Sequence, residues 1–395
     1  MEHAEFGIPK IFQDRQSLEG RLFMMQCKRK IIPTEDPTIF FEDNEVGRLK
    51  KEVWDMTEEQ LDAVLEEYGM GGPSEMGLPN TYIQTTPRQT VIERRRKNDI
   101  IFVPIGCTEN HGYHANTGLD TFMCSLIVEG VRRYTEKHGD QCAIALPPLN
   151  YGGHPYHHLG MPGTIIEPHE VVVETIIYMM LGLWNDGFRK IILINNHGHA
   201  WMLESAIQEF CKRFQLPGIF RTLDWHRAVR EFFVPVDRPD SLETNFVHAD
   251  ESETSVALLL FKDMIDMNVV QDANPEPLLP DGHFDTSVEP LRRPNRCTEG
   301  EGHASIERSA TPCGVVGHPS LASARKAKRP IVAILKYLTL LHDQIHEAYP
   351  AGTVPPVEKT TLRTEAEMLP FLQEPFSEGW KSVYELPAMG VFTKG

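Results

Sequence analysis

Residues 190–195 read Lys-Ile-Ile-Leu-Ile-Asn, and this apolar run is the clearest strand signal in the sequence. Such a run is typical of a strand buried on both faces of a parallel sheet. Similar runs predict three further strands, over residues 99–106, 142–149 and 218–225. Helices are predicted over residues 121–138, 169–188, 201–214, 250–267 and 321–346. This alternation predicts an α/β fold with a mostly parallel central sheet and helices on both faces.

The regions on either side of this α/β segment differ from it in composition. The N-terminal region is charged and weakly periodic, although a helix with a capping box is expected from Thr57, with Gln60 three residues later. Residues 272–320 are rich in proline, glycine and charge, which is typical of a functional loop or lid. We therefore divide the chain into an N-terminal extension, a central domain and a C-terminal extension, over residues 1–95, 96–348 and 349–395.

The overall composition narrows the class of protein. The 395-residue chain has a formal net charge of -17, and a field of that sign repels phosphate backbones, so a nucleic-acid partner is not expected. We find no apolar stretch long enough to span a membrane and no recognisable signal peptide. The seven cysteines are scattered and include no Cys-x-x-Cys pair, which favours a reducing, cytoplasmic location.

Polar side chains follow the predicted strands at the point where each strand ends, and ligands bind at this edge of parallel sheets. Glu109 and His111 follow the first strand two residues apart, so in an extended segment their side chains point the same way. Imidazole and carboxylate together suit Zn, Mn or Fe. Asp120 is expected to bridge two metal ions, although its place before a predicted helix also makes it a candidate N-cap.

Two further clusters are expected at the same edge of the sheet. His197 and His199 directly follow the clearest strand and are candidate metal ligands, or else loop histidines with ordinary hydrogen bonds. Glu253 lies about one turn into a predicted helix, where it is a candidate ligand or general base. Asp250 and Glu251, in the first turn, suit the helix dipole.

The order and spacing of these motifs over roughly residues 98–345 resemble the creatininase family of metal-dependent amidohydrolases. The matching blocks are Glu109-Asn-His111-Gly-Tyr-His114 with Asp120, His158-Leu-Gly-Met-Pro162-Gly163-Thr164, Asn195-Asn-His197-Gly198 and His248-Ala-Asp-Glu-Ser-Glu253-Thr-Ser. The terminal extensions are similar to those of a longer branch of the family, which hydrolyses a C–C bond of a diketo-inositol (3-dehydro-scyllo-inosose) in inositol catabolism.

The resemblance implies a three-layer α/β/α fold, two divalent metal ions per chain (Zn, Mn or Fe) and a homo-oligomer, a hexamer or a dimer. By matching motifs, Glu109 and His197 would hold one ion, His111 the other, and Asp120 would bridge them. Creatininase itself has a glutamate where this chain has His199. The second ion is therefore expected to take either His199 or Glu253 as its further ligand.

The implied reaction is the attack of metal-activated water on a carbonyl in the ring of a small polar substrate, which opens the ring. His248 is expected to protonate the leaving group, with Glu253 as the second catalytic candidate, and a hydrogen bond at the helix entry is the alternative role for His248. The groups expected around the substrate are His114, Tyr113, His158 and the backbone N–H groups of Gly163 and Thr164.

Other functions stay open at this point. A creatininase-type amidohydrolase would break the C–N bond of a cyclic amide or formamide instead, but the tryptophans that clamp creatinine in creatininase have no match here. A non-catalytic protein would keep the site to bind metal or sugar. A partner in cofactor maturation would need a groove large enough for a peptide.

Overall fold

The computed structural model describes residues 30–148, 150–153, 160–244, 246–274, 311–387 and 389. The chain divides into two compact units, Met1–Asp55 and Met56–Gly395. In the smaller unit, the short strands β1 (Ile31–Pro33) and β2 (Phe40–Glu42) pair in antiparallel fashion and are followed by helix α2 (Glu45–Asp55). The aromatic rings of Phe41 and Trp54 pack edge to face inside this unit, with centroids 6.0 Å apart.

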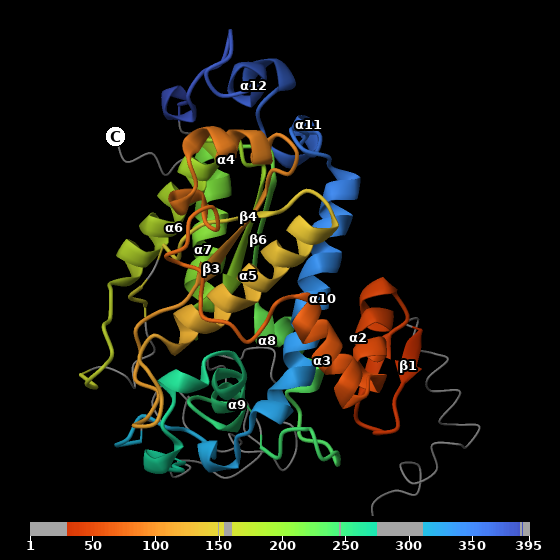
Figure 1. The fold of residues 1–395 in the computed structure, drawn as a ribbon. Helices are drawn as coiled ribbons and strands as arrows, with labels where there is room; N and C mark the ends of the chain where they lie inside the picture. The colour runs from red at the N-terminus through yellow and green to blue at the C-terminus, as the bar shows by residue number, and fades with distance from the viewer. Residues whose placement is uncertain are drawn as a thin grey trace, which may run out of the picture. The chain divides into compact units, whose positions relative to one another are not determined.

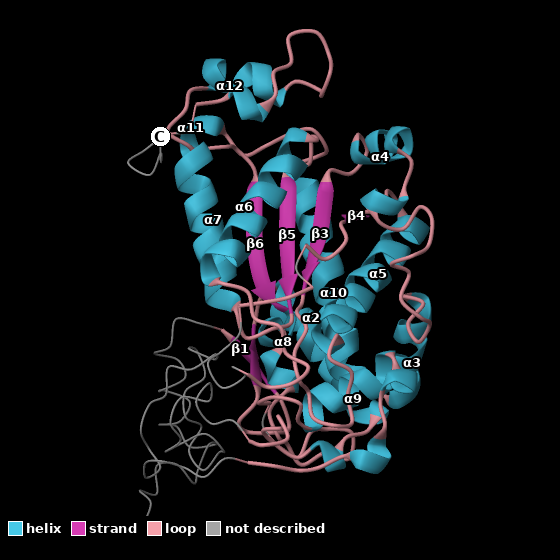
Figure 2. Cartoon of the chain, turned by 90° about the vertical axis from the view of Figure 1, so that its left-hand side faces the viewer, coloured by secondary structure: helices cyan, strands magenta, loops and turns pink. Residues whose placement is uncertain are grey.

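A four-stranded parallel sheet forms the centre of the larger unit (Figure 2). The strands lie in the order β4–β3–β5–β6, with the bounds Ala143–Ile144 (β4), Ile100–Ile105 (β3), Lys190–Asn195 (β5) and Ile219–Asp224 (β6). Every residue of β3 and β5 is buried, as their unbroken apolar runs predict. Ile105 pairs with Asn195, so the segments that follow these two strands begin side by side.

Helices cover both faces of this sheet (Figure 1). Helices α6 (His169–Asn185) and α7 (Ala200–Phe214) lie on one face, and α5 (Leu119–His138) and α10 (Ala324–Ala348) lie on the other. Among the described residues, the larger unit also contains the α-helices α3 (Glu58–Glu67), α4 (Arg88–Arg95), α8 (Trp225–Ala228), α9 (Glu251–Leu260), α11 (Val357–Thr360) and α12 (Glu365–Leu372). The expected α/β/α fold is confirmed. Among the described residues, no helix is long and apolar enough to cross a membrane.

One predicted strand is much shorter than its apolar run. Within the run over residues 142–149, of which residues 142–148 are described, the strand β4 takes up only two residues. Pro147 and Pro148 stand inside that run, and proline has no backbone N–H to donate to a neighbouring strand. The backbone N–H of Leu146, just before them, already donates to the side chain of Gln84 at 2.9 Å instead of to a strand. The sheet therefore ends early at this edge.

A buried ion pair joins the amino-terminal ends of the two central strands. Lys190 Nζ donates to Asp99 Oδ1 at 2.6 Å, and both side chains are buried. The backbone N–H of Gly352 donates to the other oxygen of Asp99 at 3.1 Å, which ties the segment after α10 to the sheet. Removing one member of such a pair leaves the other charge buried without compensation.

We therefore expect Asp99→Ala to lower the free energy of unfolding by about 3–5 kcal/mol, measured by urea denaturation followed by circular dichroism. The double variant Asp99→Leu/Lys190→Met should recover most of this loss, because it removes both charges. The partly exposed Glu209, which lies 3.1 Å from Lys212 Nζ and 3.7 Å from Arg213 Nε, serves as a control, and Glu209→Ala should cost at most about 1 kcal/mol. A loss in Asp99→Ala no larger than in this control would contradict the prediction.

Candidate metal centre

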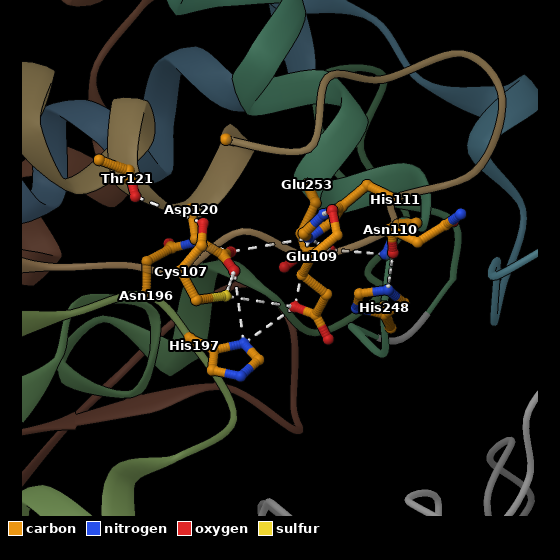
Figure 3. A network of polar contacts seen from close by, with 12 residues as sticks. Cys107, Glu109, Asn110, His111, Asp120, Thr121, Asn196, His197, His248 and Glu253 are labelled. Carbon is orange, nitrogen blue, oxygen red and sulfur yellow. Dashed lines mark hydrogen bonds and ion pairs between the residues drawn. The ribbon is translucent and has the colours of Figure 1, made fainter. Parts of the chain in front are cut away.

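The loop after β3 returns directly to the first turn of α5. Gly106 permits this close approach, because a Cβ at this position would lie 2.4 Å from the backbone nitrogen of Thr121. Helix α5 begins at Leu119 with Gly118 as its N-cap residue, so the N-cap role considered for Asp120 is wrong. The Asp120 side chain instead faces the loop that carries Glu109 (Figure 3).

Four buried side chains form what we call the first group, which consists of Cys107, Glu109, Asp120 and His197 (Figure 3). His197 Nδ1 lies 2.9 Å from Glu109 Oε2 and 3.3 Å from Asp120 Oδ2. Cys107 Sγ lies 2.9 Å from the same oxygen of Asp120. Burial lowers the pKa of His197, but the carboxylates of Glu109 and Asp120 outweigh it and raise this pKa to about 10.

The second group consists of His111, Asp120 and Glu253, all of them buried. The Glu109 carbonyl lies 3.1 Å from His111 Nδ1 and can only accept a hydrogen bond, so it places the ring proton on Nδ1 and the lone pair on Nε2. His111 Nε2 lies 3.6 Å from Asp120 Oδ1 and 3.8 Å from Glu253 Oε2. It has no hydrogen-bond partner among the described residues. A buried lone pair that faces carboxylates in this way suits a metal cation.

Asp120 belongs to both groups, and its two oxygens face different partners. Oδ2 faces Cys107 and His197, whereas Oδ1 faces His111. The side-chain amide of Asn196 donates to Oδ1 at 2.7 Å, and the indole N–H of Trp225 donates to the amide oxygen of Asn196. These hydrogen bonds fix the orientation of the carboxylate that the two groups share.

The first turn of α9 carries Glu253 into the second group. This helix begins at Glu251 and ends at Leu260, earlier than the predicted end at residue 267. Asp250 is its N-cap residue, and its Oδ1 accepts the backbone N–H of Glu253 at 3.0 Å. Glu253 Oε2 itself accepts the backbone N–H of Ala249 at 2.6 Å. Burial is the main cause that raises the pKa of Glu253 well above its usual range.

His199 lies next to these groups without joining them. It is buried and directly precedes α7. Its ring packs edge-on against the ring of His197, with centroids 4.6 Å apart. A Cβ at Gly152 would lie 3.1 Å from His199 Nδ1, so this side of the ring is closely packed. Among the described residues, the sets close enough to share one ion include Glu253 and leave out His199.

His248, the candidate proton donor, lies beside the second group. Its Nε2 is 2.8 Å from the backbone carbonyl oxygen of Asn110, and its ring centroid is 4.5 Å from that of His111. It also lies close enough to Glu109 and His111 to form a third set of ligand atoms. His248 is only partly buried, so the edge of this site is accessible from outside.

The side chains expected around the substrate differ in exposure. Tyr113 is 65% exposed, which leaves its hydroxyl group in solvent. His114 is buried, with Nε2 2.9 Å from the hydroxyl oxygen of Thr254, and burial lowers its pKa to about 4. The neutral ring of His114 packs against α9 through its contact with Thr254. His158 lies outside the described residues.

The turn that contains Gly163 and Thr164 is tied to the loop after β3. The backbone N–H of Asn110 donates to the hydroxyl of Thr164 at 2.9 Å, and the side-chain amide of Asn110 donates to the Pro162 carbonyl at 2.9 Å. The backbone N–H of Thr164, which was expected to face the substrate, instead donates to the Met161 carbonyl at 3.2 Å within the turn. Gly163 has a φ of +88°, a conformation that suits glycine.

Two residues of the site, Cys107 and Asn196, were missed by the sequence-based prediction, although each carries a local signal. Cys107 precedes Glu109 by two residues, the same spacing that links Glu109 to His111, so its side chain is expected on the same side. Asn196 directly precedes His197 at the end of β5. Its role depends on Asp120, which is far away in the sequence.

The creatininase family model, described as creatinine amidohydrolase, matches residues 85–341. The 3-dehydro-scyllo-inosose hydrolase of Thermotoga maritima is 41% identical over 303 residues, which cover 77% of this chain and 96% of that relative. A creatininase variant solved with creatine has a TM-score of 0.52 at 18% identity and shares the fold over 68% of this chain and 99% of its own. A Zn-Zn type creatininase variant has a TM-score of 0.50 at 18% identity, over 68% of this chain and 98% of its own. The extent of the family match and the similarity to the Thermotoga relative show that this chain belongs to the creatininase family of metal-dependent hydrolases.

Proposed function

We propose that this enzyme opens the ring of 3-dehydro-scyllo-inosose by hydrolysing a C–C bond, with divalent ions held in the first and second groups. The relative from Thermotoga maritima supports this substrate, because the similarity covers almost all of that relative. The position of Asp120 is the main support for metal dependence, because its two oxygens face two different sets of buried candidate ligands. A homo-oligomer and a cytoplasmic location stay predictions.

The residues of the two groups fit two such ions. Glu109 and His197 would hold one ion, His111 and Glu253 would hold the other, and Asp120 would lie between them. Imidazole and carboxylate ligands of this kind suit Zn, Mn and Fe. When bound, the ions would lower the pKa of water towards ~7 and polarise a ring carbonyl.

His248 is suited to move the proton that this reaction needs. The Asn110 carbonyl can only accept a hydrogen bond, so it places a proton on His248 Nε2, and Nδ1 is then the basic nitrogen of the neutral ring. When a C–C bond of a 1,3-diketone breaks, the departing carbon is stabilised as an enolate by its neighbouring carbonyl and then needs one proton. We infer that the partly exposed imidazole of His248, beside His111, donates this proton.

The loops around the site hold backbone and amide groups where a hydroxylated substrate would meet them. Asn110 is fixed by its bonds to the turn at residues 162–164, and the N–H of Ile165 donates to the Thr108 carbonyl at 3.1 Å. These bonds keep the turn against the loop after β3. A substrate with several hydroxyl groups would therefore meet a preformed polar segment beside the two groups.

We expect the purified holoenzyme to turn over 3-dehydro-scyllo-inosose with a kcat/KM at least about 100-fold above that for creatinine, followed by nuclear magnetic resonance of the ring-opened product. Metal analysis should give about two ions per chain. Glu109→Gln should lower turnover at least about 1000-fold with an unchanged circular dichroism spectrum. Preferred turnover of creatinine or another cyclic amide would instead favour C–N hydrolysis, and turnover by the metal-free protein would contradict metal dependence.

The second ion is expected to depend on Glu253 and not on His199. Glu253→Ala should lower the metal content after dialysis from about two ions per chain to about one, because the second group loses a carboxylate. His199→Asn should keep about two ions, since this ring lies outside both groups. Inductively coupled plasma mass spectrometry measures both variants, and the opposite pattern would assign the ligand role to His199.

Asn196 is expected to act through the orientation of Asp120. Asn196→Ala should weaken metal binding by about 10–100-fold, as is usual when the hydrogen-bond partner of a ligand is lost. Trp225→Phe keeps an aromatic ring but removes the N–H that holds Asn196, so it should have a smaller effect in the same direction. Competition with a fluorescent chelator measures both affinities, and unchanged binding in Asn196→Ala would contradict this role.

A further inference from the structure

We propose that Cys107 is a metal ligand whose thiolate completes the first group, so that this group selects a thiophilic ion such as Zn²⁺. The inference rests on the proposed function, because it requires that ions occupy the two groups. It adds a sulfur ligand to the set of imidazoles and carboxylates that the family motifs imply. The two ions would then differ in their surroundings, since the second group offers only nitrogen and oxygen.

The distances in the first group agree with four ligands around one ion. Zinc bonds of ~2.3 Å to sulfur and ~2.0–2.2 Å to nitrogen or oxygen put neighbouring ligands of a tetrahedral site roughly 3.3–3.6 Å apart. Cys107 Sγ lies 2.9 Å from Asp120 Oδ2 and 3.8 Å from Glu109 Oε2. His197 Nδ1 lies 3.3 Å from Asp120 and 2.9 Å from Glu109. The tetrahedral separation falls inside this range, so small rotations of the side chains suffice.

The sulfur atom is held in this position by the backbone and by its neighbours. Cys107 is fully buried, and a Cβ at Gly152 would lie only 2.8 Å from the Cβ of Cys107, so this face of the cysteine is closely packed. Cys107, Glu109 and His111 follow one another at intervals of two residues after β3. Figure 3 shows the thiol of Cys107 directed towards the carboxylates of Glu109 and Asp120.

A second observation points to a cation at these carboxylates. His111 Nε2 is fully buried, has no hydrogen-bond partner among the described residues, and lies 3.8 Å from Glu109 Oε2 and 3.6 Å from Asp120 Oδ1. The lone pair on His111 Nε2 and the two carboxylates repel one another. A thiol that only donates a hydrogen bond to Asp120 would not relieve this repulsion. Cations between these groups remove it, and the sulfur of Cys107 reaches the same two carboxylates.

The chemical consequence is a preference for a softer ion in the first group. Thiolate favours Zn²⁺ and Co²⁺ over Mn²⁺ and Mg²⁺, whereas imidazole and carboxylate alone discriminate less. When an ion binds, the proton of the Cys107 thiol leaves to solvent and the Sγ–metal bond forms, with no change of oxidation state. Replacement of this cysteine should therefore alter the metal preference of the first group more than it alters the fold.

The test is the absorption spectrum of the holoenzyme loaded with two Co²⁺ ions per chain. A sulfur-to-cobalt charge-transfer band in the near ultraviolet is expected in the wild-type protein and in Cys124→Ser, and it should be lost in Cys107→Ser. Cys124 is a matched control, because it is also fully buried and donates to the Asp120 carbonyl at 3.0 Å but belongs to neither group. Cys107→Ser should also lower the ratio of Zn²⁺ to Mn²⁺ affinity at least about 10-fold.

If Cys107→Ser does not fold, X-ray absorption at the zinc edge of the unaltered enzyme decides the question. With zinc in both groups, an average of about half a sulfur atom per zinc at ~2.3 Å is expected, because only one of the two ions would carry the thiolate. Scattering from nitrogen and oxygen alone, or a wild-type protein that holds two Co²⁺ ions without the charge-transfer band, would overturn the sulfur ligand and leave the proposed function intact. A protein that takes up no divalent ion at all would contradict the proposed function itself.

Discussion

The side-chain amide of Asn196 donates to Asp120 Oδ1 at 2.7 Å, and this bond turns the other oxygen of the carboxylate towards Cys107 and His197. The arrangement of the first and second groups depends on this orientation, because both groups include Asp120. A rotated Asp120 would face only one of the two groups. The amide is itself oriented by Trp225, the first residue of α8 directly after β6, so the end of this strand takes part in positioning the shared carboxylate.

The fold supports this arrangement through close backbone contacts. Gly106 lets α5 approach β3, and the pairing of β3 with β5 starts the loops that carry Glu109 and His197 next to each other. The N-cap at Asp250 then aims the first turn of α9 at the same place. Several acidic side chains and imidazoles are thereby buried together, and in the absence of cations this concentration of charge destabilises the folded chain.

The sequence predicted the features that depend on neighbouring residues. The apolar run of β5 and the capping box of Thr57 and Gln60 were predicted, because a strand and a helix cap are specified locally. The same holds for Glu109 and His111, whose spacing puts them on one side of an extended segment. That Glu253 lies nearer than His199 to His111 and Asp120 was not predictable, since it depends on how α9 packs against a loop far away in the chain. The short strand β4 is a different case, because the two prolines that end it are visible in the sequence.

The side chains of the two groups come from four separate stretches of the chain, namely the loop after β3, the first turn of α5, the loop after β5 and the first turn of α9. An unfolded chain cannot present them to one ion together, so ions bound as proposed would stabilise only the native state. At a free ion concentration about 1000 times the dissociation constant, this coupling contributes roughly 4 kcal/mol. The lifetime of the protein would then follow the metal supply, and a cell short of metal would lose the enzyme to proteases as well as its activity.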